Sequence, residues 1–241
     1  SSLQKIAKDL KGYAELRNVI GNVENFDPLE LYASLDKEID YRYEKSSSYG
    51  DPNNKTNINE TVFDPPFRQK SAFVFDRLLK AVKDDAKNGK PKVEVVTLFN
   101  AAANASKMDM DFVSLELMEA ANSLDKSKSP ENSARLIRQR LTMSRITSEE
   151  AIQAIQEVIT QTRGFQFTHV LSEAFNIGLK TAQPVRIARM MTEKTHPTLW
   201  STSFSKLIAA RLYLMGETSK DWEEGEKLFN EGIDLIKNEP S

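Results

Sequence analysis

The sequence of 241 residues contains no cysteine and only two histidines, His169 and His196, which lie far apart. Without cysteine the chain can form no disulfide, no thiolate nucleophile and no cysteine-ligated zinc or iron–sulfur site. Neither histidine has nearby a Ser-Asp or carboxylate arrangement that would make it a catalytic base, so we interpret both as structural. We therefore predict that the protein is not an enzyme and holds no metal and no cofactor.

Glycine is also scarce, with nine residues, about half of the usual share of roughly 7%. There is no Gly-rich phosphate-binding loop and no nucleophile elbow. Asp109 and Asp111 open no calcium loop, because the Gly and the closing Glu of that motif are missing. The acidic group Glu223, Glu224, Glu226 and Asp234 is interpreted as a solvated helix face beside an apolar face of Trp222, Phe229 and Ile233.

Long hydrophobic runs are absent as well. No stretch approaches the roughly 18 apolar residues that a membrane-spanning helix needs. The first residues carry neither a secretory core nor an Arg-rich presequence, and we interpret the chain as a processed form or a fragment. With 39% hydrophobic and 28% charged residues, we expect a soluble intracellular protein.

Apolar residues recur instead at three- and four-residue steps, which is typical of amphipathic helices, and no segment alternates with period two. Caps and prolines mark the helix starts: Asp27 before Pro28, Ser129 before Pro130, and the capping-box pair Thr147 and Glu150. After Pro66 the pattern predicts a helix ended by Asn88-Gly89 and Pro91, then helices at about 92–105, 110–124, 131–145, 148–162, 166–180, 184–194, 199–215 and 221–237.

Three parts follow from this pattern. Residues 1–45 form an N-terminal helical pair, whose first helix carries the stripe from Leu3 to Ile20. Residues 46–66 are rich in Ser, Asn and Pro and form a long loop, interpreted as a linker. Residues 67–241 form a helical-repeat domain.

A repeat of near 35 residues runs through the last part. Ile137 and Leu141 recur as Leu171 and Phe175, and Leu171 and Ala174 recur as Leu207 and Ala210. This period predicts an all-α, right-handed α-solenoid of antiparallel helix hairpins without a sheet.

The last hairpin carries the most specific resemblance. Trp222 follows an acidic residue, Gly225 and Gly232 lie seven apart around Phe229, and Pro240 closes the unit. This pattern resembles the second helix of a tetratricopeptide repeat, although the preceding helix lacks that family's Trp and Gly-Tyr spacing. The hairpins from 131 to 194 resemble degenerate pentatricopeptide repeats about as well.

Charge is polarised along the chain. Residues 132–215 hold 11 Lys or Arg against 5 acidic residues, whereas 1–131 and 216–241 are net acidic, at −3 and −5. If the helices stack, exposed arginines can form a basic stripe able to meet carboxylates or phosphates. An ordinary solvated surface, with pairing to Glu149, Glu150 and Glu193, explains the pattern equally well. The candidate partner-binding residues are Arg135, Arg138, Arg145, Arg186 and Arg189.

We therefore expect a non-catalytic scaffold or adaptor that holds a partner protein, namely an acidic peptide or helix. The alternative is single-stranded RNA binding, which the pentatricopeptide resemblance implies together with organelle gene expression and the mitochondrial matrix. A subunit held in a larger assembly through its apolar helix faces is a third hypothesis.

Overall fold

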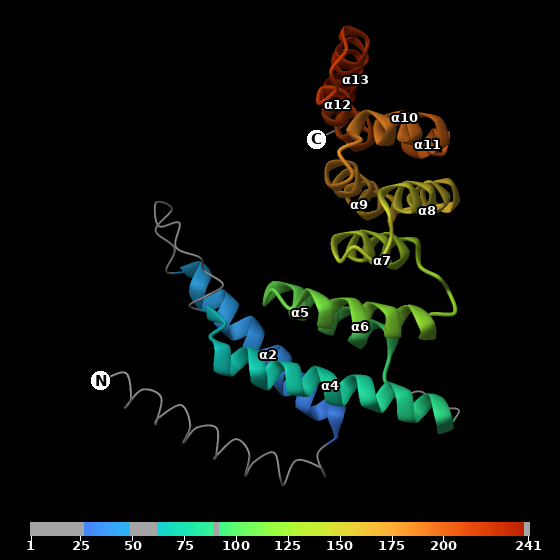
Figure 1. The fold of residues 1–241 in the computed structure, drawn as a ribbon. Coiled ribbons are helices and arrows are strands. Elements are labelled where there is room, and N and C mark those ends of the chain that lie inside the picture. The colour runs from blue at the N-terminus through green and yellow to red at the C-terminus, as the bar shows by residue number, and fades with distance from the viewer. Residues whose placement is uncertain (1–26, 49–61, 89–91, 239–241) are drawn as a thin grey trace. The chain divides into compact units, whose positions relative to one another are not determined.

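The computed structural model describes residues 27–48, 62–88 and 92–238. These ranges hold eleven helices and no strand, which confirms the prediction of an all-α protein (Figure 1). The expected helix between Leu3 and Ile20 and most of the 46–66 loop lie outside the described residues. The chain divides into two compact units, Ser1–Val93 and Glu94–Ser241.

The described helices of the first unit are α2 (Pro28–Ser48) and α4 (Pro65–Asn88), and they pack against each other. Asp27 accepts a hydrogen bond of 2.9 Å from the Leu29 amide, as its predicted capping role requires. Leu35, Ile39, Phe75 and Leu78 are fully buried between the two helices. Because α4 packs with α2, the structure divides at Val93, whereas the sequence pattern places α4 at the start of the repeat domain.

The second unit contains nine helices in its described part. They form consecutive pairs and one short helix: α5 (Val95–Lys107), α6 (Asp111–Leu124), α7 (Pro130–Thr142), α8 (Ser148–Gln161), α9 (Phe167–Lys180), α10 (Pro184–Lys194), α11 (Pro197–Trp200), α12 (Ser203–Tyr213) and α13 (Ser219–Asn238). Besides sequence neighbours, helices further apart also pack: α7 with α9, α8 with α10, and α12 with both α9 and α10. One apolar core joins α7 to α13 and is centred on side chains such as Ile155, Leu171 and Ile187.

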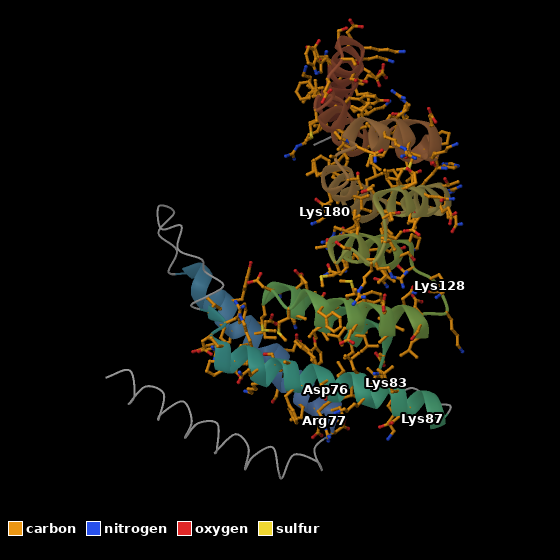
Figure 2. All side chains as sticks on the ribbon, viewed as in Figure 1. Asp76, Arg77, Lys83, Lys87, Lys128 and Lys180 are labelled. Carbon is orange, nitrogen blue, oxygen red and sulfur yellow. The ribbon has the colours of Figure 1, made fainter. Side chains whose placement is uncertain are left out.

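The helix starts follow the sequence signals closely. Thr147 and Glu150 form the predicted capping box, with the Glu150 amide 3.2 Å from Thr147 Oγ1 and the Thr147 amide 2.8 Å from Glu150 Oε2. Pro130, Pro184 and Pro197 open their helices, although Ser129 makes no side-chain cap. Lys87 and Lys180 lie in the last turns of α4 and α9, where the helix dipole favours a cation (Figure 2).

One predicted helix is divided in two. The pattern over 199–215 suggests a continuous helix, but α11 ends at Trp200 and α12 begins at Ser203. Thr202 lies between them in an extended conformation, and its hydroxyl accepts a hydrogen bond from the Ser205 amide. This local cap starts a new helix. The apolar periodicity therefore runs through residues 199–215, although the helix is interrupted.

Two glycines set the closeness of α12 and α13. A Cβ atom at Gly225 would lie 2.8 Å from Leu214 Cγ, and one at Gly232 would lie 2.9 Å from Leu207 Cδ2. Both distances are shorter than a carbon–carbon contact allows. The small residues therefore let the two helices approach, as the sequence pattern indicates.

Candidate partner-binding surfaces

The five predicted arginines lie on different elements of the second unit. Arg135 and Arg138 belong to α7, Arg145 lies between α7 and α8, and Arg186 and Arg189 belong to α10. Arg138 contacts α9 through Glu173, whereas Arg186 contacts the start of α8 through Glu149. Arg138 and Arg186 therefore contact different neighbouring helices.

Arg186 and Glu149 form the best-defined of these pairs. Nη1 and Nη2 of Arg186 each donate to a carboxylate oxygen of Glu149 at 2.6 Å. The hydrogen bonds from Arg186 hold the pKa of Glu149 below its ordinary value, and the same contact raises the pKa of Arg186. Both side chains remain exposed, so water and salt screen the pair.

Pairing also neutralises the arginines of α7. Arg138 forms an ion pair with Glu173, and both side chains are more than two-thirds buried. Arg135 lies 2.7 Å from Glu131, one turn earlier on the same helix. Of the five candidates, only Arg145 and Arg189 make no ion pair with the residues that the structure describes.

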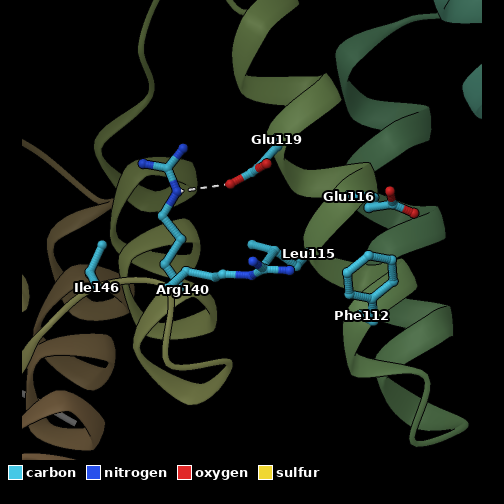
Figure 3. A pocket seen from close by; sticks show the side chains of 7 residues that line it. Phe112, Leu115, Glu116, Glu119, Arg140 and Ile146 are labelled. Atoms are coloured by element: carbon cyan, nitrogen blue, oxygen red, sulfur yellow. Dashed lines mark hydrogen bonds and ion pairs between the residues drawn. The ribbon is translucent and has the colours of Figure 1, made fainter.

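Arg145 lines a cleft of about 530 Å³ between α6 and α7 (Figure 3). Its guanidinium carbon lies 5.9 Å from the centre of the half-exposed Phe112 ring, at the outer limit of a cation–π contact. Arg140 points across the cleft to Glu119, with Nε 3.1 Å from the carboxylate (Figure 3). The lining residues are Phe112, Leu115, Glu116, Glu119, Arg140, Arg145 and Ile146. Two arginines and two glutamates balance, so the net charge of the cleft favours no ion of either sign.

Both histidines make polar contacts. His169 Nδ1 lies 4.0 Å from Glu131, and His196 Nδ1 lies 2.7 Å from the Thr198 hydroxyl at the start of α11. Within the described ranges, no three His, Asp or Glu side chains gather as a metal ion would require. No described helix combines the length and apolar character needed to cross a membrane.

The last hairpin presents an apolar surface that the sequence interpretation assigned wrongly. Trp222 and Phe229, expected on the buried face of α13, are 49% and 47% exposed. The residues of α13 that are buried are Gly225, Leu228 and Gly232. Trp222 and Phe229 belong to a group of exposed or half-buried apolar residues on α13 and directly after α12. We call this surface the end face, and its residues are Leu214, Met215, Trp222, Phe229, Ile233 and Ile236.

The side chain of Trp222 is held in place by a hydrogen bond. Its indole Nε1–H donates a hydrogen bond of 2.7 Å to the backbone carbonyl of Gly216, in the turn between α12 and α13. This bond satisfies the polar end of the side chain and holds the ring against the turn. A signal for this arrangement exists in the sequence, because Gly225 and Gly232 mark the line of contact with α12.

No protein-family model, curated protein or solved structure matches the chain significantly.

Proposed function

We propose that the chain is a non-catalytic helical-repeat protein, a right-handed α-solenoid, that binds a helical segment of a partner protein on its end face. The single observation that carries this proposal is the exposure of Trp222, Phe229 and Ile236 along one side of the last helix. The solenoid arrangement is supported by packing between helices that are not sequence neighbours, such as α7 with α9 and α8 with α10.

The end face differs from the surfaces of the earlier hairpins in what covers it. α9 packs against α7, α8, α10 and α12, and its aromatic residues Phe167 and Phe175 are buried. Among the helices that the structure describes, α13 packs chiefly against α12, on the side that carries the two glycines. In a stack of hairpins, the uncovered side is where a further helix would pack.

The size of the end face favours a protein ligand. Its large side chains, each about half exposed, leave roughly 400–500 Å² of apolar surface in water, within the range of the largest patches on monomeric proteins. Patches of this size are frequently interaction sites, and Trp, Phe and Met are enriched at the centres of interfaces.

The arginine contacts support protein binding over single-stranded RNA binding. A phosphate-binding surface needs guanidinium groups that are available to phosphate oxygens. Three of the five candidate arginines are held by Glu131, Glu149 and Glu173.

Affinity purification with matched variants tests the proposal. The end-face variant Phe229→Ser/Ile236→Ser is compared with Phe165→Ser, which changes an 87% exposed aromatic residue between α8 and α9. We expect a partner that wild type and Phe165→Ser retain after RNase treatment and that the end-face variant loses. A partner set that is identical for all three proteins would refute the proposal, and loss on RNase treatment would favour RNA binding.

A further inference from the structure

We infer that the occupant of the end face is a basic amphipathic α-helix of a partner protein, with lysine or arginine flanking its apolar side. This inference rests on the proposed function and names the class of partner. Three observations carry it: the line of the apolar side chains, the unpaired carboxylates beside them, and the net charge of α13.

The apolar side chains follow the axis of α13. Trp222, Phe229 and Ile236 are spaced by seven residues, which places them on one line along the helix, about 10 Å apart. Leu214 and Met215 are also exposed, and they directly precede Gly216, whose carbonyl accepts the indole hydrogen bond of Trp222. A straight apolar row on a helix is the surface into which another amphipathic helix packs, with contacts at i, i+3 or i+4, and i+7.

Carboxylates lie along the outer edge of this row. Glu226 is four residues after Trp222 and three before Phe229, so it lies on the same side of α13. Glu223 is three residues before Glu226 and lies further round the helix from the apolar row. Both are exposed, and neither forms an ion pair with a described residue. A lysine or arginine on the partner helix would therefore meet an available carboxylate.

Two other glutamates of α13 differ in this respect. Glu231 is 2.8 Å from Lys206 of α12, and Glu224 pairs with Lys227 on α13 itself. These carboxylates already have cationic partners. The available negative charge thus lies next to the apolar row, where it selects a partner by charge.

The same charge disfavours a second copy of the chain as the occupant. α13 contains six acidic and three basic residues. Pairing two copies of α13 would bring like charges together across the apolar row, which costs binding energy. An acidic helix and a nucleic acid are disfavoured for the same reason.

Two synthetic peptides provide the direct test. Each is about 20 residues long, the length of α13, and carries the same leucine row, with lysine on the flanks of one and glutamate on the flanks of the other. The protein carries Trp200→Phe, which leaves Trp222 as its only tryptophan. We expect the lysine peptide to shift the Trp222 emission saturably to shorter wavelength, and the glutamate peptide to bind at least about tenfold more weakly.

Matched variants locate the binding and separate its two components. Phe229→Ser/Ile236→Ser should abolish lysine-peptide binding, whereas Phe165→Ser should retain it. Glu223→Gln/Glu226→Gln should weaken the lysine peptide by about three- to tenfold and remove most of the salt dependence between roughly 0.05 and 0.5 M.

The remaining outcomes would overturn the inference in distinguishable ways. Equal binding of both peptides would refute the charge selection and leave the proposed function standing. Binding of neither peptide to the folded protein would refute both. A dimer in light scattering that Phe229→Ser/Ile236→Ser dissociates would assign the end face to a second copy.

Discussion

Helices α9 and α13 both carry apolar side chains over a wide arc, but only α9 has that arc covered. Four helices pack around α9, and Phe167, Leu171 and Ile177 are at most 3% exposed. On α13 the comparable side chains Trp222 and Phe229 are about half exposed. The comparison teaches that apolar periodicity reports how much surface a helix offers for packing, whereas the number of neighbouring helices decides how much is buried.

The largest expected difference between the two helices is in the cost of removing a phenylalanine. Phe167→Ala in α9 should lower the free energy of unfolding by about 3–5 kcal/mol, because it removes a buried ring and leaves a cavity. Phe229→Ala in α13 should change it by less than about 1 kcal/mol, because the ring is already half in water. Urea unfolding followed by circular dichroism measures both. Similar losses for the two variants would show that the end face is covered within the chain.

Adding one methyl group compares the helix contacts themselves. Gly225→Ala should lower the free energy of unfolding by about 1–2 kcal/mol, because the new Cβ would lie 2.8 Å from Leu214 Cγ and 3.1 Å from the Leu214 backbone nitrogen. Gly178→Ala in α9 is the matched control. There the nearest atom, Ile187 Cγ1, lies at 3.3 Å, and the better helix propensity of alanine offsets the tighter contact, so we expect a change within about 1 kcal/mol. Equal losses at the two positions would contradict the close approach of α12 and α13.

The helix boundaries were predictable because their signals are local. A proline in the first turn or a Thr147–Glu150 capping box acts within a few residues, and the structure places α7, α8 and α10 within three residues of their expected ends. The break at Thr202 is also local, but the continuous apolar periodicity over 199–215 hides it.

The candidate sites were less predictable because they depend on neighbouring helices. Arg186 is 37 residues from Glu149, and Arg138 is 35 residues from Glu173. Because the partners are so far apart in the sequence, no local pattern predicts either ion pair. The repeat of near 35 residues that the sequence predicts would place such positions on adjacent hairpins. Trp222 is exposed because no helix in the described part of the chain packs over it. The amphipathic pattern of α13 does not indicate whether such a neighbouring helix is present.

Ion pairs between helices also contribute to the packing around α9. Arg138 of α7 pairs with Glu173 of α9, and Arg186 of α10 pairs with Glu149 of α8. Arg138→Ala should lower the free energy of unfolding by about 1–3 kcal/mol, because Glu173, whose side chain is 13% exposed, loses its cation. The control Arg135→Ala breaks the pair with Glu131 within α7 and should cost at most about 0.5 kcal/mol. A double-mutant cycle with Glu173→Ala isolates the coupling, and a coupling near zero would show that Arg138 acts only through packing.

The smallest expected effect is the pH dependence of the Arg186–Glu149 pair between α10 and α8. Hydrogen bonds from Arg186 lower the pKa of Glu149 in the folded protein. The unfolded chain therefore binds a proton at higher pH than the folded one, and the pair contributes stability above the ordinary glutamate pKa. This contribution is lost as the pH falls through the lowered pKa. Arg186→Gln should thus destabilise the protein slightly at neutral pH and not at the acidic end of this range, with a smaller difference in high salt because the pair is exposed. An NMR titration should show the pKa of Glu149 rising toward its ordinary value in the variant, and an unchanged value would mean that Arg186 does not hold Glu149 in solution.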